Sequence, residues 1–179
     1  MDFKDLVQKR RSIRRFTDEE LTAEQVQTIV RAGLMAPSSK GTRAWHFIVV
    51  EDKDKLERLS QCRPAGAEFI KGAPLAIVVA MDSRVTDVWV EDAAIAAVTM
   101  QYQAADLGLG SCWAQVRLRT WPDALSAADI LRDILQCPDW LEPLCIIGIG
   151  HAAIERKLQD EDKLKWEAVH VDSFAAVQE

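Results

Sequence analysis

No apolar run in this chain reaches the 18 residues that a membrane-spanning helix needs. The N-terminal stretch MDFKDLVQKRR lacks the apolar core of a signal peptide. Positive charge is also in deficit, since 22 Lys and Arg stand against 28 Asp and Glu for a formal net charge of −6. A general nucleic-acid binder carries a basic face, and this balance argues against one. We therefore expect a cytoplasmic protein with neither a membrane nor nucleic acid as a partner.

Cysteine and histidine are few, and their spacing matches no common metal site. The four Cys residues show no CxxC motif, and the three His residues are scattered with no Cys or carboxylate motif beside them. Structural zinc sites need such spacings, so we expect no metal. Without a secretory signal, the Cys residues are expected to be buried free thiols rather than disulfides. They are Cys62, Cys112, Cys137 and Cys145.

Internal repeats, low-complexity tracts and interdomain linkers are also absent from the sequence. Its 179 residues fit a single domain, residues 1–179. Residues 151–179 are rich in charged residues and show no core pattern until Val169. Such a C-terminal arm either frays or extends onto a partner subunit. The alternation in Val169-His170-Val171 suits an added strand.

The chain is organised around the stretch from Glu91 to Gln115. Its first part, residues 91–107, has no Gly or Pro and is rich in Ala, the best helix former. A helix that is apolar nearly all round belongs in a core or between subunits. Gly108 and Gly110 then end the helix. Residues 111–115 suit a buried strand end, so we expect this stretch to bring a tight turn and exposed backbone to a binding site.

The remaining segments alternate between helical and strand patterns. Thr22 and Gln25 make a capping box, and Pro37 limits the helix that follows. The run LAIVVAM at 75–81 is apolar throughout, as in a strand buried on both faces. Segment 63–72 contains one Pro and two Gly and is expected to be irregular and mobile. The other expected helices are 2–9, 54–61 and 126–136, and the other expected strands are 46–50 and 144–150. This order predicts an α+β fold in which helices cover a sheet.

A local reversal of charge stands out near the N-terminus. Five cations fall within seven residues, with no carboxylate among them. They form either a solvated basic surface that pairs with nearby acids, or an anion site, since Arg binds phosphate through forked hydrogen bonds. The residues alone favour neither interpretation over the other. The five are Lys9, Arg10, Arg11, Arg14 and Arg15.

Four motifs in the correct order resemble those of the nitroreductase family of FMN flavoproteins, in its short-chain form. They are RRSIRRF at 10–16, APSS at 36–39 followed by WHFIV at 45–49, EDAA at 91–94 through GLGSCW at 108–113, and KLK at 163–165. The resemblance implies a central, mostly antiparallel sheet covered by helices, in an intertwined homodimer. FMN would lie in a cleft at the dimer interface.

The resemblance also implies a cofactor-binding set drawn from four parts of the chain. Cations and a hydroxyl near the N-terminus would hold the phosphate and ribityl chain, with Arg14 nearer the ring. Two lysines of the C-terminal segment would reach the phosphate. A loop of the second subunit would touch the ring, and the backbone at 114–115 would place an N–H on flavin N5. The set is Arg10, Arg11, Ser12, Arg14, Pro37, Ser38, Ser39, Gly41, Ala114, Gln115, Lys163 and Lys165.

The chain departs from the family pattern in its second motif, after its third motif and in its length. Gly41, Arg43 and Ala44 stand where the family usually has Asn and then Gln-Pro, and Gly41 removes an Asn side-chain contact to the flavin or to the loop. Val116 stands where the family often has Gly, and we expect it to alter access to flavin N5. The long insertion that covers the active site in larger members is missing.

The activity that the resemblance implies is an FMN-dependent NAD(P)H oxidoreductase, a nitroreductase, acting by a ping-pong mechanism. Its partners would be NAD(P)H and a small flat acceptor such as a nitroaromatic or a quinone. The flavin carries the chemistry, so no side chain is assigned a catalytic role. The alternative is an FMN-binding redox sensor or carrier with little turnover, which Gly41, Val116 and the missing cover favour. A third interpretation is an enzyme that consumes the flavin or oxidises a peptide.

Overall fold

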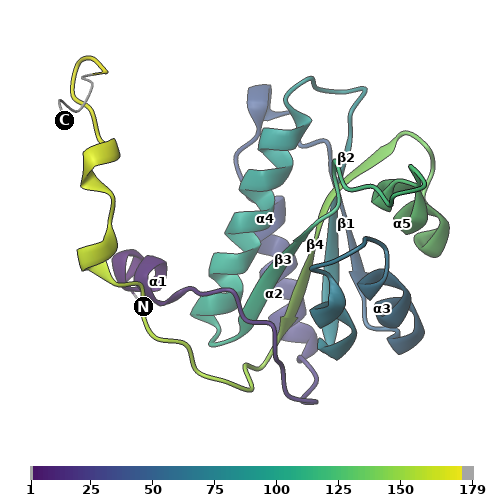
Figure 1. Ribbon diagram of the computed structural model, residues 1–179, viewed down its shortest axis with the longest axis horizontal. Coiled ribbons are helices and arrows are strands. Elements are labelled where there is room, and N and C mark those ends of the chain that lie inside the picture. The colour runs from purple at the N-terminus through teal and green to yellow at the C-terminus, as the bar shows by residue number, and fades with distance from the viewer. Residues whose placement is uncertain (1, 175–179) are drawn as a thin grey trace.

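A four-stranded antiparallel sheet forms the centre of the computed structural model, which describes residues 2–174 (Figure 1). Along the sheet the strand order is β1-β2-β4-β3. All three neighbouring pairs run antiparallel, and the β2–β4 register shifts between Val79 and Ala80, where Pro143 lies opposite. Proline has no N–H to give to the ladder, which accounts for an irregularity at that point. The strands are β1 Trp45–Val50, β2 Leu75–Asp82, β3 Gly110–Gln115 and β4 Leu141–Gly150.

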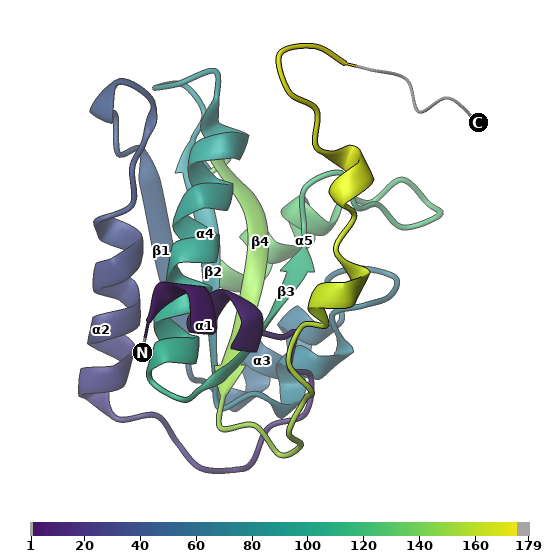
Figure 2. The ribbon, with the colours of Figure 1, turned by 90° about the vertical axis from the view of Figure 1, so that its left-hand side faces the viewer.

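Helices cover both faces of the sheet and make a three-layered body (Figures 1 and 2). On one face lie α2 (Ala23–Leu34) and α4 (Trp89–Asp106), with the short α1 (Phe3–Lys9) against α4. On the other face lie α3 (Lys53–Ser60) and α5 (Ala127–Leu135). The expected α+β fold, with helices over a mostly antiparallel sheet, is confirmed.

The two faces of the sheet serve two separate cores. Along β2, Ile77 and Val79 pack with α2 and α4, whereas Ala76 and Val78 pack with α3 and α5. Successive residues of a strand point to opposite faces, so a strand with a core on each side must be apolar at every position. This requirement explains the unbroken apolar run of β2, whose residues 75–81 are at most 1% exposed.

Helix α4 confirms the expected central helix. Ala93, Ala96, Ala97 and Met100 are fully buried against the sheet, because their small or flexible side chains allow close packing. The helix ends where Gly108 adopts a φ of 78° and Leu109 N–H donates to the Ala104 carbonyl at 2.8 Å. A positive φ costs glycine little, so the chain turns there directly into β3.

Helix α2 begins as the sequence predicts. Thr22 accepts a hydrogen bond from Gln25 N–H at 3.2 Å, and Gln25 Oε1 accepts from Thr22 N–H at 2.8 Å. This reciprocal pair satisfies two donors of the first turn.

The four cysteines are free, as expected, and Cys62, Cys112 and Cys145 are buried. Within residues 2–174, no helix combines the length and the apolar character required to cross a membrane.

One expectation about a connecting segment is wrong. Segment 63–72 is not irregular throughout, because the 3₁₀ helix η2 (Glu68–Gly72) occupies its second half and Ile70 is fully buried there. The added strand at Val169–Val171 is not formed within a single chain. The short 3₁₀ helix η4 (Trp166–Ala168) precedes it, and the segment stands away from the sheet edges that a strand would need (Figure 1).

Candidate functional site

The arginine segment, residues 10–16, runs along the free edge of the sheet. Strand β3 is an edge strand, and Ser12 forms a parallel bridge with Ser111 there. Ile13 N–H donates to the Ser111 carbonyl at 2.9 Å. At its far end the segment is held by a Phe16–Ala152 bridge, just beyond the end of β4. The arginine segment is therefore held at Ser12 by β3 and at Phe16 by the chain that follows β4.

Gln115 stands further along the same edge, and its backbone groups point outward. Val116 N–H donates to the Leu144 carbonyl at 3.0 Å, so residue 116 belongs to a hydrogen-bonded pair with β4. Antiparallel pairs alternate between bonded and non-bonded, so the Gln115–Cys145 pair is non-bonded. The N–H and C=O of Gln115 are consequently turned away from β4, whereas those of Ala114 are turned toward it.

Three of the predicted residues converge on one thiol. Burial raises the pKa of Cys112, while the positive charge of Arg14, a hydrogen bond from the Ser12 side chain and the charge of Arg10 lower it. Arg10 lines a hollow together with residues 108–111, and Ser12 and Arg14 line a neighbouring one. Because Ser12 pairs with Ser111, the three residues lie near the start of β3.

Two adjoining hollows extend from the arginine segment toward the C-terminal arm, residues 152–174. One of about 610 Å³ is lined by Arg10, Arg11 and residues 108–111. The other, of about 640 Å³, has Arg11 and Lys163 in its wall. Both volumes fall within the range of small-molecule sites. The structure thus brings a predicted cation of the C-terminal segment to the same region as the N-terminal arginines.

Arg11 and Lys163 also make contacts of their own. Arg11 Nη1 donates to the Leu158 carbonyl at 3.2 Å and to the Lys157 carbonyl, so it ties the arm to the body. Lys163 Nζ lies 3.0 Å from Asp160 Oδ2, and its side chain is 82% exposed. Lys165 precedes η4 and is exposed. Both lysines are thus open to an anion from solvent.

The serine loop, residues 37–41, lies elsewhere. Ser39 N–H donates to Asp92 Oδ1 at 2.8 Å, and Arg43 N–H donates to Ser38 Oγ at 3.1 Å. Asp92 sits in the first turn of α4, whereas the arginine segment meets β3 beyond the last turn. Eighteen helical residues span about 27 Å. Within one chain, the serine loop and the arginine segment are therefore at opposite ends of α4.

Gly41 and Val116, which depart from the family pattern, differ in their surroundings. A Cβ added at Gly41 would meet no atom within 4 Å, so a side chain there has open space, although the φ of 66° strains any residue but Gly. Val116 is fully buried in the core with α5. Its side chain therefore does not face the free edge, which argues against the expectation that it alters access to flavin N5.

One residue beside Gln115 was missed by sequence reasoning. Arg63 Nη1 donates to the Gln115 carbonyl at 2.8 Å, yet it belongs to a connection with no motif and left no signal in the sequence. Asp92, by contrast, belongs to the EDAA stretch of the third motif, and the helix dipole favours a carboxylate in the first turn of α4. It is 3% exposed, and its Oδ2 has no hydrogen-bond partner among residues 2–174.

Comparison with known proteins places this geometry in a family. The family model described as "Nitroreductase family" matches residues 7–63 and 60–151. The structure of an FMN-dependent nitroreductase from Clostridium difficile R20291 is 48% identical, with a TM-score of 0.92 over 94% of this chain and 98% of that one.

Curated relatives agree with the structural match. A protein of Methanothermobacter thermautotrophicus with the provisional name NADH dehydrogenase/NAD(P)H nitroreductase is 34% identical over 93% of this chain and 88% of its own length. The FMN reductase (NADPH) of Bacillus subtilis is 30% identical over 80% of this chain and 63% of its own. The length of the family match and these identities show that the chain belongs to the nitroreductase family.

Proposed function

We propose that this protein is an FMN-dependent oxidoreductase that passes electrons from NAD(P)H to a small flat acceptor, such as a nitroaromatic or a quinone. One observation carries the proposal: the arginine segment is clamped along the free edge of β3, and the same edge ends at the outward N–H of Gln115. The names of the relatives, an FMN-dependent nitroreductase and an FMN reductase, support it.

The residues along this edge fit FMN. A phosphate dianion needs converging cations and hydroxyl donors, which Arg10, Arg11 and Ser12 would supply at the start of β3. A flavin ring nitrogen needs a fixed donor, which the backbone of Gln115 supplies. Ser111 and Gln115 lie four positions apart along β3, or about 14 Å. A ribityl chain has room to run between the two ends.

The remaining predicted residues complete this arrangement. Arg11 brings Lys163 to the phosphate end, and Lys165 follows two residues later on the arm. Of the two backbone positions, Gln115 rather than Ala114 offers its N–H, because the N–H of Ala114 faces β4. The ring face is completed from the second subunit by Pro37, Ser38, Ser39 and Gly41.

The distance between the serine loop and the arginine segment supports a second subunit. The serine loop cannot reach the arginine segment of its own chain, since α4 separates them by about 27 Å. A homodimer would bring the loop of one copy to the edge of the other. Exposed apolar side chains on α1 and α4 support this arrangement. Phe3 is 66% exposed, and Ile95 and Val98 of α4 are 37% and 38% exposed.

In this mechanism the chain binds and orients while the cofactor reacts. FMN, when bound, would supply the transfer of a hydride's two electrons from NAD(P)H to the acceptor, in ping-pong order. The N–H of Gln115 would donate a hydrogen bond to the flavin ring at the free edge of β3. The family resemblance assigns Arg14 to the ring, where its charge would balance negative charge on the reduced flavin. No side chain needs to act as a general acid or base.

Purified protein should be yellow, elute as a dimer and bleach anaerobically with NADH or NADPH. Reoxidation by menadione or a nitrofuran at steady-state rates would distinguish an enzyme from a sensor or carrier. Arg10→Ala should weaken FMN binding, whereas Arg31→Ala, on the exposed side of α2, should not. A colourless protein that does not take up added FMN would contradict the proposal.

A further inference from the structure

We propose that Arg63 is a positioning residue for the flavin and that its charge favours the reduced ring. The inference rests on the proposed function and extends it to a residue outside every motif. Arg63 lies in the connection between α3 and η2, and its guanidinium holds the carbonyl of Gln115 through a 2.8 Å hydrogen bond from Nη1.

The contact fixes Arg63 at the outward side of the free edge. The Gln115–Cys145 pair is non-bonded, so the carbonyl and the N–H of Gln115 both point away from β4. Arg63 meets the carbonyl there, and flavin N5 would meet the N–H of the same residue. One residue of backbone and two hydrogen bonds then separate the guanidinium from N5, a distance within about 10 Å.

The guanidinium is also held in place from its own side. Arg63 Nε is buried with no hydrogen-bond partner in the described part of the chain. Gly66 has a φ of 85°, and a Cβ added there would come within 3.3 Å of Arg63 Nη2. The backbone therefore packs closely against the guanidinium, and a buried, incompletely bonded cation keeps much of its field.

Two titratable groups face Arg63. Burial raises the pKa of the Cys62 thiol to about 11, so that neighbour is uncharged at neutral pH. Glu68 is ionised and opposes the field, but both its oxygens accept hydrogen bonds from Gly66 N–H, at 2.8 and 3.0 Å. Glu68 is exposed and Arg63 half-buried, so solvent screens the acid more than the cation.

The chemistry needs a cation at this place. Hydride transfer adds two electrons and one proton to oxidised FMN and leaves one net negative charge on the ring. A positive charge within about 10 Å, at an effective dielectric constant of roughly 20, changes such an equilibrium by on the order of tenfold. Arg63 therefore adds to Arg14 from the opposite end of the edge, and also fixes the peptide that binds N5.

The test compares three variants of the full chain loaded with FMN. Arg63→Gln removes the charge, and Arg63→Lys keeps it. Arg58→Gln removes a charge of the same sign five residues earlier, on α3, where Arg58 pairs with Asp133 at 3.5 Å. The measurement is the midpoint potential of the bound flavin, together with the FMN dissociation constant. We expect Arg63→Gln to lower the equilibrium constant for reduction roughly tenfold, which is about 30 mV for a two-electron couple.

Each outcome is decisive. A potential unchanged in Arg63→Gln relative to Arg58→Gln would overturn the proposal while leaving FMN binding by the wild type intact. If Arg63→Gln does not retain FMN, Arg63→Lys decides: a wild-type potential supports the role of charge, and a folded lysine variant without FMN overturns it. Wild-type protein that never binds FMN would instead refute the proposed function itself.

Discussion

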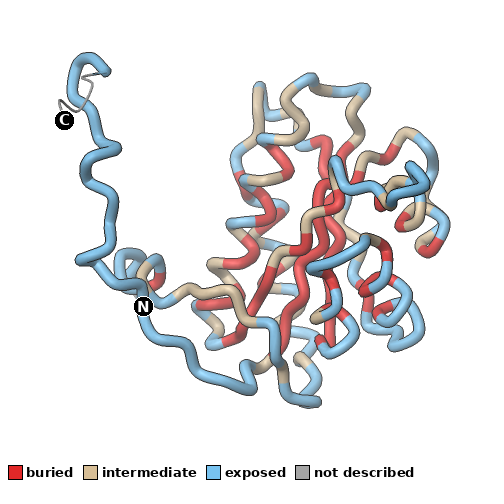
Figure 3. The backbone as a smooth tube through the Cα atoms, in the orientation of Figure 1, coloured by how far each residue is buried: buried red, intermediate tan, exposed pale blue. Residues whose placement is uncertain are grey.

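The body of the molecule and its C-terminal arm both contain apolar side chains, but the body buries many of them whereas the arm exposes them (Figure 3). Residues 75–81 of β2 are all buried, whereas every residue of the arm, 152–174, is exposed. Seven large apolar side chains of the arm face solvent. They are Ile154, Leu158, Leu164, Trp166, Val169, Val171 and Phe174. Burial therefore depends on a second surface to pack against, and one chain supplies that surface to the body alone.

The arm is nevertheless tied to the body at its start. Gln159 N–H donates to the Gln8 carbonyl at 2.9 Å, and Gln8 Nε2 donates back to the Gln159 carbonyl at 3.3 Å. With Arg11, these bonds anchor the arm beside α1 (Figure 2). Beyond them the chain extends away from its own core. An anchored segment with an unpacked apolar remainder is suited to covering a second copy, and we propose that the arm does so.

The largest contrast should come from removing the same three carbons from each region. Ile147→Ala opens a cavity in a fully buried site of β4 and should lower the free energy of unfolding by about 2–5 kcal/mol. Leu164→Ala, in the arm, should change it by less than about 0.5 kcal/mol when the chain is monomeric. Urea unfolding at low protein concentration measures both.

Raising the concentration sharpens this comparison. If the arm covers a second copy, the cost of Leu164→Ala should grow with protein concentration, because dimerisation then stabilises the folded chain. The cost of Ile147→Ala should not. If Leu164→Ala instead costs as much free energy of unfolding as Ile147→Ala at every concentration, Leu164 packs in the core of its own chain, and the proposed arm is contradicted.

The next effect is on the ligand. A chain ending at Ile154 keeps the Phe16–Ala152 bridge and both hydrophobic cores, so its body should fold cooperatively. It loses Lys163 and Lys165, and its affinity for FMN should fall roughly 100-fold, or about 2.8 kcal/mol. Fluorescence titration with FMN measures this loss. The double variant Lys163→Gln and Lys165→Gln keeps the arm, and should lose affinity while remaining dimeric.

The sequence predicted the body well because its signals are local and repeated. Thr22 and Gln25 specify the start of α2, and the unbroken apolar run of β2 specifies burial on both faces. The strand expected at Val169–Val171 is not formed within a single chain for a related reason. Alternation states that one side of a segment is apolar, but hydrogen bonding needs an adjacent strand, which one chain does not offer there.

The candidate site was predictable only in part. The charge reversal around Arg10 and the turn at Gly108 marked the two elements that meet at Ser12 and Ser111. The outward direction of the Gln115 backbone depends on the register with β4, which no local pattern states. Arg63 was missed because its contact with Gln115 joins residues 52 positions apart. Long-range contacts of single side chains leave no periodicity in a sequence.

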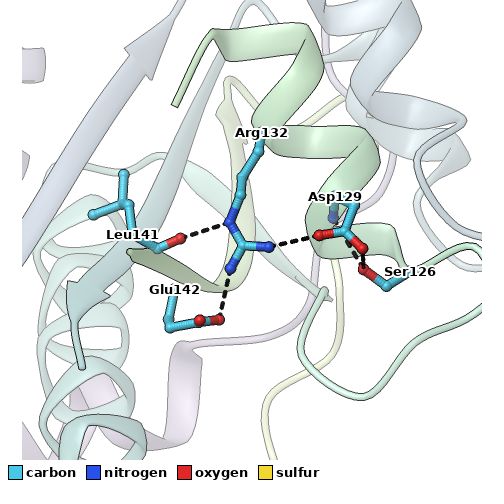
Figure 4. A network of polar contacts seen from close by, with 5 residues as sticks. All are labelled: Ser126, Asp129, Arg132, Leu141 and Glu142. Carbon is cyan, nitrogen blue, oxygen red and sulfur yellow. Dashed lines mark hydrogen bonds and ion pairs between the residues drawn. The ribbon is translucent and has the colours of Figure 1, made fainter. Parts of the chain in front are cut away.

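Ion pairs give a third and smaller contrast. Arg132 is 14% exposed and bonds to three groups: Leu141 carbonyl at 2.9 Å, Asp129 at 2.8 Å and Glu142 at 2.8 Å (Figure 4). Arg132→Gln should cost about 1–3 kcal/mol of stability, because bonds to a half-buried charge are lost together. Lys163→Gln breaks an exposed pair with Asp160 and should cost less than about 0.5 kcal/mol. Thermal unfolding of the two variants tests the difference, and equal costs would show that Arg132 adds little.

The smallest effect concerns the carboxyl of Asp82 at the end of β2, whose side chain is 13% exposed. A bidentate hydrogen bond from Arg84, at 2.7 and 2.8 Å, lowers the pKa of Asp82 from 3.8 to about 2. Arg84 is itself held against Trp140, whose ring centre lies 4.5 Å from the guanidinium carbon. The body thus holds this ion pair in a defined geometry, in contrast to the exposed side chains of the arm.

A lowered pKa in the folded state means that the pair stabilises the fold above about pH 3.8 and that this contribution is lost as the pH falls toward 2. Carboxyl NMR should show Asp82 titrating near pH 2 in the wild type. In Arg84→Gln the midpoint should return toward 3.8, while Arg84→Lys, which keeps the charge but loses the forked geometry, should lie between. A midpoint near 3.8 in all three proteins would show that the contact with Arg84 does not persist in solution, and that surface side chains of the body are as loosely held as those of the arm.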